Sequence, residues 1–362
     1  MSAVLAGAPH TAIGPASRAR GTTAVRVWLY VLAFLVVVMV GVGGATRLTG
    51  SGLSITEWKP VTGAIPPLSE AAWSAEFGRY RASSQYQNLN RGMSLGEFKW
   101  IYAWEWGHRQ LGRLLGLAFF LPLAWFWWKG QLRGRLALAL LGIGALGGLQ
   151  AAVGWIMVAS GLQPGMVAVA PVKLTLHLTI ASVILAALVW IAAGMRQGPE
   201  RGARSSPYPW LALAFPALVL AQIALGGLVA GSRSGLTYNT WPLMDGRLVP
   251  PPDALFAIRP WIENFAANPT LVQFNHRAMA YLVVALALGQ AWTAWRAAPG
   301  STAARRATGI AALALAQMAL GIVTLLLMVP LWAGLAHQLL AMALIAMATV
   351  HARLSLGAAR AG

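Results

Sequence analysis

The stretch EWGHRQLG, residues 105–112, recurs as QFNHRAMA, residues 273–280, at an offset of 168 residues. In both stretches a histidine followed by an arginine stands at the start of a long apolar run. An ionisable side chain within a membrane segment is costly to desolvate and is therefore a functional-site candidate. The recurrence predicts a chain made of two related halves, each with a polar group placed for function.

The composition is that of a protein that crosses a membrane many times. Of 362 residues, 58% are hydrophobic and only 10% are charged, which is unlike a soluble enzyme. A transmembrane helix needs about 20 predominantly apolar residues, and eight such windows follow one another along the chain. They are residues 25–44, 107–128, 135–158, 171–193, 209–230, 271–294, 306–328 and 332–353. We therefore predict an all-α integral membrane protein with eight transmembrane helices.

The net charge of +18 is explained by a membrane rather than by nucleic acid. Arginines and lysines gather in the N-terminal tail, at the C-terminus, and in the connections after the second, fourth and sixth windows. With eight spans these five segments lie on one side, and the positive-inside rule makes that side the cytoplasm. We predict cytoplasmic N- and C-termini, outward-facing loops over 45–106 and 231–270, and no nucleic-acid partner.

A second pair of matching stretches extends the repeat into the outer loops. GLSITEWKPVTGAIPP (52–67) aligns with GLTYNTWPLMDGRLVP (235–250) at an offset of 183 residues. An even number of spans per half gives both halves the same orientation, so we predict two tandem four-helix bundles related by an axis along the membrane normal. The expected domains are a cytoplasmic tail (1–24), an N-terminal bundle (25–195), a cytoplasmic linker (196–208), a C-terminal bundle (209–353) and a second cytoplasmic tail (354–362).

Four of the six histidines are candidate ligands. We expect His10 and His351 to be solvated or snorkelling. The other four are spread over the second, fourth, sixth and eighth windows, each within about two turns of the outer end: His108, His177, His276 and His337. Two pairs at similar depth favour heme iron held from both axial sides. Zinc is less favoured, because it prefers three or four ligands and the chain has no cysteine.

Other polar and small residues near the histidines fit a heme site. A small residue, which leaves room for a flat macrocycle, stands four positions after each ligand on the same helix face: Gly112, Ala181, Ala280 and Ala341. Arg109 and Arg277 are candidates for binding a heme propionate, with snorkelling to the interface as the alternative. Arg47, just after the first window, is a third candidate.

The two halves differ at one position beside the histidines. Glu105 precedes His108 by three residues and shares its helix face, whereas the second half has Gln273 at that position. The asymmetry indicates a division of labour, in which one heme is chemically altered and the other remains a cofactor. The alternative is that Glu105 is an interfacial residue or an acid at a helix N-terminus.

With these residues in view, the chain resembles the heme A synthase family. The resemblance covers nearly all of residues 25–353 and rests on GGATRLTGSGLSITEWKPVTGAIPP, EWGHRQLGR, LTLHLTIA, GSRSGLTYNTWPLMDG, FNHRAMAY and LAHQLLAM. It implies eight transmembrane helices in two bundles. It also implies oxidation of the C8 methyl of heme O, through an alcohol, to the formyl group of heme A. Some members have a cysteine pair in an outer loop, and this chain has none.

The resemblance also assigns roles to the candidate residues. It implies that His108 and His177 hold the substrate heme and that His276 and His337 hold a heme b cofactor. Glu105 matches the carboxylate that the family uses in the reaction. We expect this carboxylate to stabilise positive charge at the methyl carbon, or to orient and deprotonate an attacking water.

The resemblance places the protein in a bacterial inner membrane with its active site toward the periplasm. The expected partners are heme O, heme A, membrane lipid and an electron donor of unknown identity. Heme O synthase, an oxidase assembly partner and a second copy of the chain are further candidates. The main alternative is a diheme b-type membrane subunit that only transfers electrons. A transporter built from parallel repeats is less favoured, because it predicts broken helices near the midplane.

Overall fold

The computed structural model describes residues 15–195 and 209–359, and within these ranges every long element is a helix. Eight helices are long and apolar enough to cross a membrane. They are α1 (Pro15–Leu48), α4 (Leu95–Trp128), α5 (Gly134–Gly161), α6 (Pro171–Gly194), α7 (Pro209–Ser232), α10 (Pro269–Ala297), α11 (Thr302–Leu326) and α12 (Leu331–Ala359). The prediction of an all-helical chain with eight spans is confirmed for the described residues.

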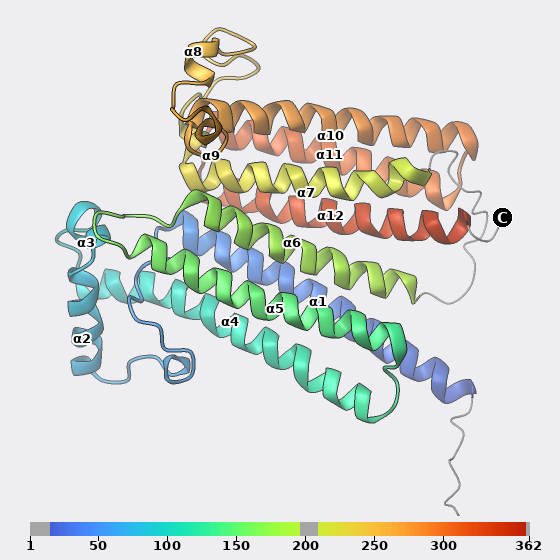
Figure 1. Cartoon of the computed structure of the whole chain (residues 1–362), viewed down its shortest axis with the longest axis horizontal. Helices are drawn as coiled ribbons and strands as arrows, with labels where there is room; N and C mark the ends of the chain where they lie inside the picture. The colour runs from blue at the N-terminus through green and yellow to red at the C-terminus, as the bar shows by residue number, and fades with distance from the viewer. Residues whose placement is uncertain (1–14, 196–208, 360–362) are drawn as a thin grey trace, which may run out of the picture.

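The long helices pack as two groups that follow chain order (Figure 1). The first group holds α1, α4, α5 and α6, and the second holds α7, α10, α11 and α12. The groups meet where α6 contacts α7 and where α12 contacts both α1 and α6. Small residues permit this approach: a Cβ added at Gly227 of α7 would lie 3.1 Å from the Cα of Thr175 of α6.

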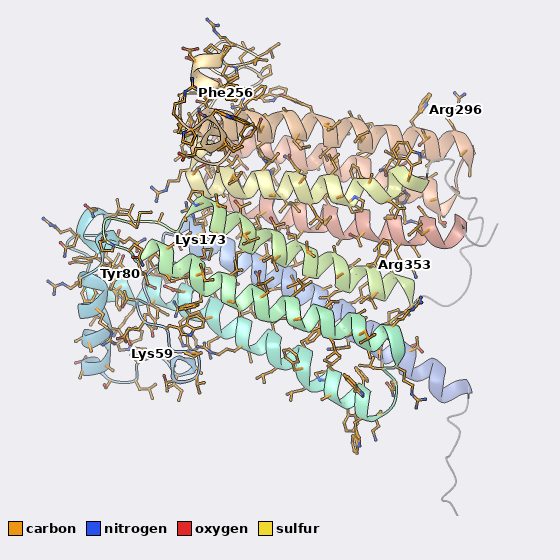
Figure 2. All side chains as sticks on the ribbon, in the orientation of Figure 1. Lys59, Tyr80, Lys173, Phe256, Arg296 and Arg353 are labelled. Atoms are coloured by element: carbon orange, nitrogen blue, oxygen red, sulfur yellow. The ribbon has the colours of Figure 1, made fainter. Side chains whose placement is uncertain are left out.

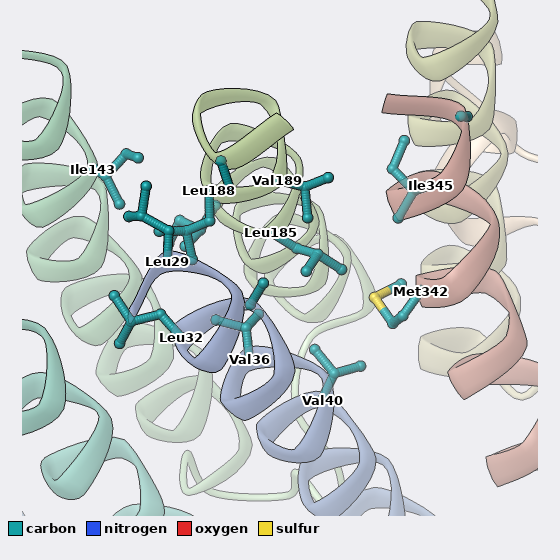
Figure 3. Packing of buried hydrophobic residues seen from close by; sticks show 14 of the residues in the cluster. Leu29, Leu32, Val36, Val40, Ile143, Leu185, Leu188, Val189, Met342 and Ile345 are labelled. Carbon is teal, nitrogen blue, oxygen red and sulfur yellow. The ribbon is translucent and has the colours of Figure 1, made fainter. Parts of the chain in front are cut away.

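Apolar side chains fill the junction between the two groups (Figure 3). Leu32 and Val36 of α1, Leu185 of α6, and Met342 and Ile345 of α12 are each at most 5% exposed. In a membrane, where lipid tails are as apolar as leucine, such helices associate through close van der Waals packing. The outward flanks show the opposite pattern, since large apolar side chains stand exposed there as expected of a surface that lipid covers.

Short elements gather at one end of the helices (Figure 1). Between α1 and α4 lie η1 (Thr62–Ala64), α2 (Glu70–Arg81) and α3 (Ser84–Leu89). Between α7 and α10 lie η2 (Ser234–Leu236), α8 (Pro252–Leu255), η3 (Trp261–Glu263) and α9 (Asn264–Ala267). We call this the loop end. Lys59, Tyr80 and Phe256 lie at the loop end, whereas Arg296 and Arg353 lie at the opposite end (Figure 2).

Helix α4 begins at Leu95, twelve residues before the predicted window 107–128. Ser94 starts it with a capping box: its side chain accepts from the backbone N–H of Glu97, and its own backbone N–H donates to the Glu97 carboxylate at 2.8 Å. A capping box satisfies two donors that a helix start would otherwise leave unpaired. A hydropathy window misses these turns because three charged residues lower their mean hydropathy: Glu97, Lys99 and Glu105.

The early start of α4 corrects two expectations. His108 lies thirteen residues after Leu95, which is between three and four helical turns, so the expected position within about two turns of the helix end is wrong for His108. Glu105 lies ten residues inside the same helix. The alternative that Glu105 is an acid at a helix N-terminus is therefore also wrong.

The helix ends extend into both predicted tails. Helix α1 begins inside the segment 1–24, and α12 ends inside the segment 354–362. The predicted linker 196–208 and His10 lie outside the described residues. His351, which we expected to be solvated or snorkelling, is instead only 3% exposed. Helix α12 continues past it to Ala359, so His351 is not at the helix end.

Candidate functional site

The four predicted ligands lie on four different helices. His108 is on α4, His177 on α6, His276 on α10 and His337 on α12. The last three stand six or seven residues after the first residue of their helix, at the loop end. Since α4 extends outward beyond the other helices, His108 reaches this end from a deeper position along its own helix.

Each histidine packs against a glycine on the long helix that precedes its own. A Cβ added at any of these glycines would meet the imidazole ring closer than ordinary van der Waals contact allows. The nearest approaches are 2.9 Å from Gly43 to Nε2 of His108, 2.8 Å from Gly154 to Cε1 of His177, 3.1 Å from Gly226 to Cε1 of His276, and 2.8 Å from Gly321 to Cε1 of His337. The absence of a side chain on the facing helix is therefore what makes room for each ring.

The structure brings the histidines together in two pairs. The ring centres of His276 and His337 lie 6.5 Å apart, with their planes at 79°. Two imidazoles that share one metal ion need about 2 Å for each metal–nitrogen bond, and the separation of the ring centres leaves room for both bonds. The pair therefore fits a hexacoordinate heme iron. His108 on α4 and His177 on α6 are the corresponding residues of the first helix group.

Three of the four histidine sites carry a glutamine on the facing helix. In each case the glutamine side-chain amide donates a hydrogen bond to the backbone carbonyl of the histidine. Gln150 bonds to His177 at 3.0 Å, Gln222 to His276 at 3.1 Å, and Gln317 to His337 at 2.9 Å. Each glutamine stands four residues before the glycine that faces the same ring. We call this pair of residues the Gln-Gly clamp. It holds the helix backbone at the ligand while the glycine leaves space for the ring.

The ring nitrogens differ in their contacts. The Gln222 amide lies 3.1 Å from Nδ1 of His276, and the Gln317 amide lies 3.4 Å from Nε2 of His337. The Nδ1 atoms of His177 and His337 are buried and make no hydrogen bond in the described part of the chain. Buried polar atoms without a partner are rare and require an explanation. No group of three or more histidine, cysteine, aspartate or glutamate side chains in the described residues is arranged to hold a bare metal ion. Two axial ligands for a heme remain the chemistry that these pairs fit.

Glu105 is buried and ties α4 to the turn that follows α1. One carboxylate oxygen, Oε2, accepts from the Ser54 hydroxyl at 2.8 Å and from the Ile55 backbone N–H at 2.9 Å. The other oxygen pairs with Arg109 at 2.6 Å. Only 3% of Glu105 is exposed, so the pair is largely withdrawn from solvent. The carboxylate thus stands one turn outward of His108 with donors on both of its oxygens.

Gln273 occupies the corresponding place in the second half, but its side chain donates hydrogen bonds to the neighbouring turn, whereas Glu105 accepts them. Its amide nitrogen donates to the carbonyls of Ser234 and Tyr238 at 2.8 and 3.2 Å, and its oxygen accepts from Arg277 at 3.3 Å. The second turn therefore presents acceptors where the first presents donors. Each turn matches the side chain that faces it, so the exchange of glutamate for glutamine involves the surrounding backbone as well.

The three arginines predicted to bind propionates all contact backbone carbonyls at the loop end. Arg109 donates to Ile55 at 3.2 Å, and Arg277 donates to Tyr238 at 2.8 Å. Arg47 donates to the carbonyl of Ala230 at the end of α7, at 3.0 Å. The first two contacts tie α4 and α10 to the loops that precede them, and the third ties α1 to α7. Arg109 and Arg277 each follow a predicted ligand histidine directly, but their partners differ, since Arg109 forms an ion pair with Glu105 and Arg277 donates to the neutral amide of Gln273.

The clamps were only partly recognised from the sequence. In the sequence, Gln150 and Gly154 of the third window match Gln317 and Gly321 of the seventh, but Gln222, Gly226 and the contacts of all these residues with the histidines were not predicted. A signal was present, since QAAVG (150–154), QIALG (222–226) and QMALG (317–321) share one five-residue pattern. The methyl of Met39 packs beside the small residue after His108, at 3.4 Å from a Cβ added at Gly112.

Comparison with known proteins gives matches that span almost the whole chain. A model of the COX15-CtaA family, described as cytochrome oxidase assembly proteins, matches residues 26–349. The chain is 66% identical over 339 residues to the heme A synthase of Methylobacterium sp. (strain 4-46), covering 94% of this chain and 93% of the relative. It is 67% identical over 338 residues to that of Methylobacterium radiotolerans, covering 93% and 92%. The heme A synthase of Brucella ovis is 48% identical over 348 residues, with 95% of each chain covered.

Proposed function

Since the chain belongs to the COX15-CtaA family of cytochrome oxidase assembly proteins, we propose that it is a heme A synthase that oxidises heme O to heme A. Its heme A synthase relatives match it over more than nine tenths of both chains, and this is the observation that carries the proposal. The C8 methyl group becomes a formyl group through an alcohol. This change removes four electrons and four protons from one methyl group and one water equivalent.

We propose that the chain is a tandem repeat of two four-helix bundles, over 25–195 and 209–353. Matching contacts at an offset of 183 residues support this. The hydroxyls of Thr49 and Ser51 lie 2.7 Å apart after α1, and those of Ser232 and Ser234 lie 2.5 Å apart after α7. The intervening residues, Gly50 and Arg233, both have positive φ. The same turn thus closes the first helix of each half.

We propose that the loop end faces the periplasm of a bacterial inner membrane and that both termini are cytoplasmic. Basic side chains such as Arg296 and Arg353 lie at the end opposite the loops (Figure 2), as the positive-inside rule expects of the cytoplasmic side. α1 begins and α12 ends there as well (Figure 1). The histidine pairs then lie in the outer half of the membrane, next to the loops that would cover a bound heme.

We assign the substrate heme to His108 and His177, and a heme b cofactor to His276 and His337. The presence of Glu105 beside the first pair alone supports placing the chemistry in the N-terminal half. When bound, heme b supplies one-electron transfer. The protein's own contribution at the second pair is to fix both rings through the Gln222 and Gln317 clamps. Arg109 and Arg277 place positive charge where heme propionates are expected.

Glu105 is proposed to act on the substrate as a fixed negative charge. Its oxygens accept bonds from Ser54, Ile55 and Arg109, which is the acceptor-only pattern of a carboxylate. A preorganised charge in a site withdrawn from water stabilises an opposite charge that develops during the reaction. Positive charge at the C8 methyl carbon is the state it would stabilise. Accepting a proton from an attacking water is the alternative use of the same carboxylate.

Extraction and chromatography of hemes from protein expressed with a heme O supply tests the proposal. We expect heme A from the wild type, and heme O or the alcohol from Glu105→Ala. Gln273→Ala is the matched control, since it removes the corresponding side chain in the other half and should still permit heme A to form. Unaltered heme b alone in every variant would instead identify a diheme electron-transfer subunit.

The expected partners follow from the same proposal. Heme O must be supplied by an enzyme that attaches the hydrocarbon tail to heme, and heme A must pass to an oxidase under assembly. An electron donor and a second copy of the chain are further candidates for contact. Membrane lipid is expected along the exposed apolar flanks, where Phe34, Leu121 and Trp292 are 65–66% exposed.

A further inference from the structure

We propose that His108 is the exchangeable ligand of the substrate site, because it is the one histidine of the four that lacks a Gln-Gly clamp. This inference rests on the proposed function, in which the substrate heme must enter and leave while the cofactor heme stays. The helix facing His108 carries MVGVG (39–43) where the three other facing helices carry glutamine followed by glycine at the same spacing. Met39 therefore stands at the position of the missing glutamine.

The contacts of Met39 differ in kind from those of the glutamines. A thioether has no donor to offer the His108 carbonyl. The Met39 methyl instead reaches toward Gly112, lying 3.4 Å from the position of a Cβ there. At the three clamped sites the residue at the corresponding position, four after the histidine, is alanine: Ala181, Ala280 and Ala341. At the His108 site, Met39 and Gly112 thus stand where the other three sites have a glutamine and an alanine. The two side chains still pack together, but the hydrogen bond to the histidine carbonyl is absent.

The His108 ring also meets its glycine in a different orientation. Its Nε2 atom is the closest to the position of a Cβ at Gly43, at 2.9 Å. At the three clamped sites the closest ring atom is Cε1, with Nδ1 second. The unclamped histidine therefore differs from the others in ring placement as well as in backbone anchoring.

These differences have a direct consequence for exchange. A hydrogen bond from a neighbouring helix fixes the backbone at the ligand, and in membrane bundles such a bond contributes about 0.6 kcal/mol on average. Methionine packs through flexible, non-directional contacts, so Met39 holds the backbone at His108 less rigidly than a glutamine would. The polar contacts of α4 with the first helix and its following turn lie one turn outward, at Trp104 and Glu105. His177, held by Gln150, remains as the fixed ligand of the same site. The substrate site thus combines one fixed and one adaptable ligand, whereas both ligands of the cofactor site are fixed.

The test exchanges the two kinds of residue between sites and follows release of each heme. Full-length protein carrying its hemes is purified in detergent and mixed with excess apomyoglobin, and the hemes that remain bound are extracted and separated by chromatography over time. Under the proposed function the two sites hold chemically different hemes, so heme O and heme A report the first pair and heme b reports the second. We expect Met39→Gln to slow release of heme O and heme A by about threefold, the equivalent of about 0.6 kcal/mol. Release of heme b should not change.

Three further variants make the test specific. Met39→Gln combined with Gly112→Ala restores the whole clamped arrangement and covers the case in which glutamine alone is misplaced. Gln222→Met should speed release of heme b by about threefold and leave heme O and heme A unaffected. Met39→Leu changes the side chain without adding a donor and should release hemes at the wild-type rate.

The outcomes separate this inference from the proposed function. The contrary outcome is that heme O and heme A are present and still leave Met39→Gln and Met39→Gln with Gly112→Ala at the wild-type rate. In that case the missing hydrogen bond does not control heme exchange at His108, and the inference is wrong. If the protein holds heme b alone, the proposed function itself fails and the inference falls with it. Slower release in the glutamine variants, with unchanged release from Met39→Leu, supports the exchangeable role of His108.

Discussion

Replacing Gly321 by alanine should remove heme b selectively. The new Cβ would lie 2.8 Å from Cε1 of His337, whereas ordinary contact begins at 3.4 Å, so the ring must move by about 0.6 Å (3.4 − 2.8). Metal–ligand distances tolerate changes of about 0.2 Å. The displaced imidazole can therefore no longer keep its bond to iron, and we expect at least a tenfold loss of heme affinity, about 1.4 kcal/mol.

The matched variant in the first half is Gly154→Ala, whose Cβ would lie 2.8 Å from the same atom of His177. It should lose heme O and heme A and keep heme b, the reverse of Gly321→Ala. Gly289 of α10 is the control, because a Cβ there meets nothing within 4 Å. Alanine at that helix interior position should leave both hemes bound and stabilise the helix by up to about 1 kcal/mol.

The assay is heme content per protein, measured by extraction and chromatography after purification, together with thermal unfolding to confirm that each variant is folded. Selective loss from the site whose glycine was changed would support the assignment of His177 and His337 to different hemes. If both glycine variants retained both hemes at wild-type occupancy, the rings would not be held as ligands by these contacts. The assignment of the histidine pairs would then be wrong.

Three further predictions concern Glu105, Gln273 and Tyr80 at the loop end. Glu105→Gln should lower the free energy of unfolding by about 2 kcal/mol, because an amide can accept bonds from the turn or from Arg109 but not from both; an unchanged Tm in detergent would contradict this. Gln273→Glu should also lower Tm, since its carboxylate would face the carbonyls of Ser234 and Tyr238, and a Tm at or above the wild-type value would count against that geometry. Burial raises the pKa of Tyr80 above its usual value of 10.0, so its contribution to stability is complete below pH 10 and is lost as pH rises through the higher folded-state pKa. Comparison of unfolding from pH 9 to pH 12 with Tyr80→Phe should show a shallower decline in the variant, and parallel curves would refute the role of this hydroxyl.

The eight spans were predictable because a membrane imposes a simple requirement on sequence. A helix that crosses lipid needs an uninterrupted apolar length, and hydropathy reports that length directly. The early start of α4 was missed because a capping box at Ser94 and polar outer turns stabilise helix without raising hydropathy. The burial of His351 was missed because an end-of-span position says nothing about which neighbour covers it.

The sequence by itself also determined the candidate ligands. His108, His177, His276 and His337 were evident because an imidazole in an apolar span is rare and costly. The contrast between Glu105 and Gln273 followed from aligning the two halves. These features depend on residue type and spacing along one chain, which the sequence contains in full.

Only the tertiary structure decided how those residues are held. That Ser54 and Ile55 turn donors toward Glu105, while Ser234 and Tyr238 turn acceptors toward Gln273, depends on backbone direction in two loops. The clamps and the place of Met39 depend on which residues of two packed helices come into register. Such contacts are set by close packing between segments distant in sequence, and residue type alone does not specify them.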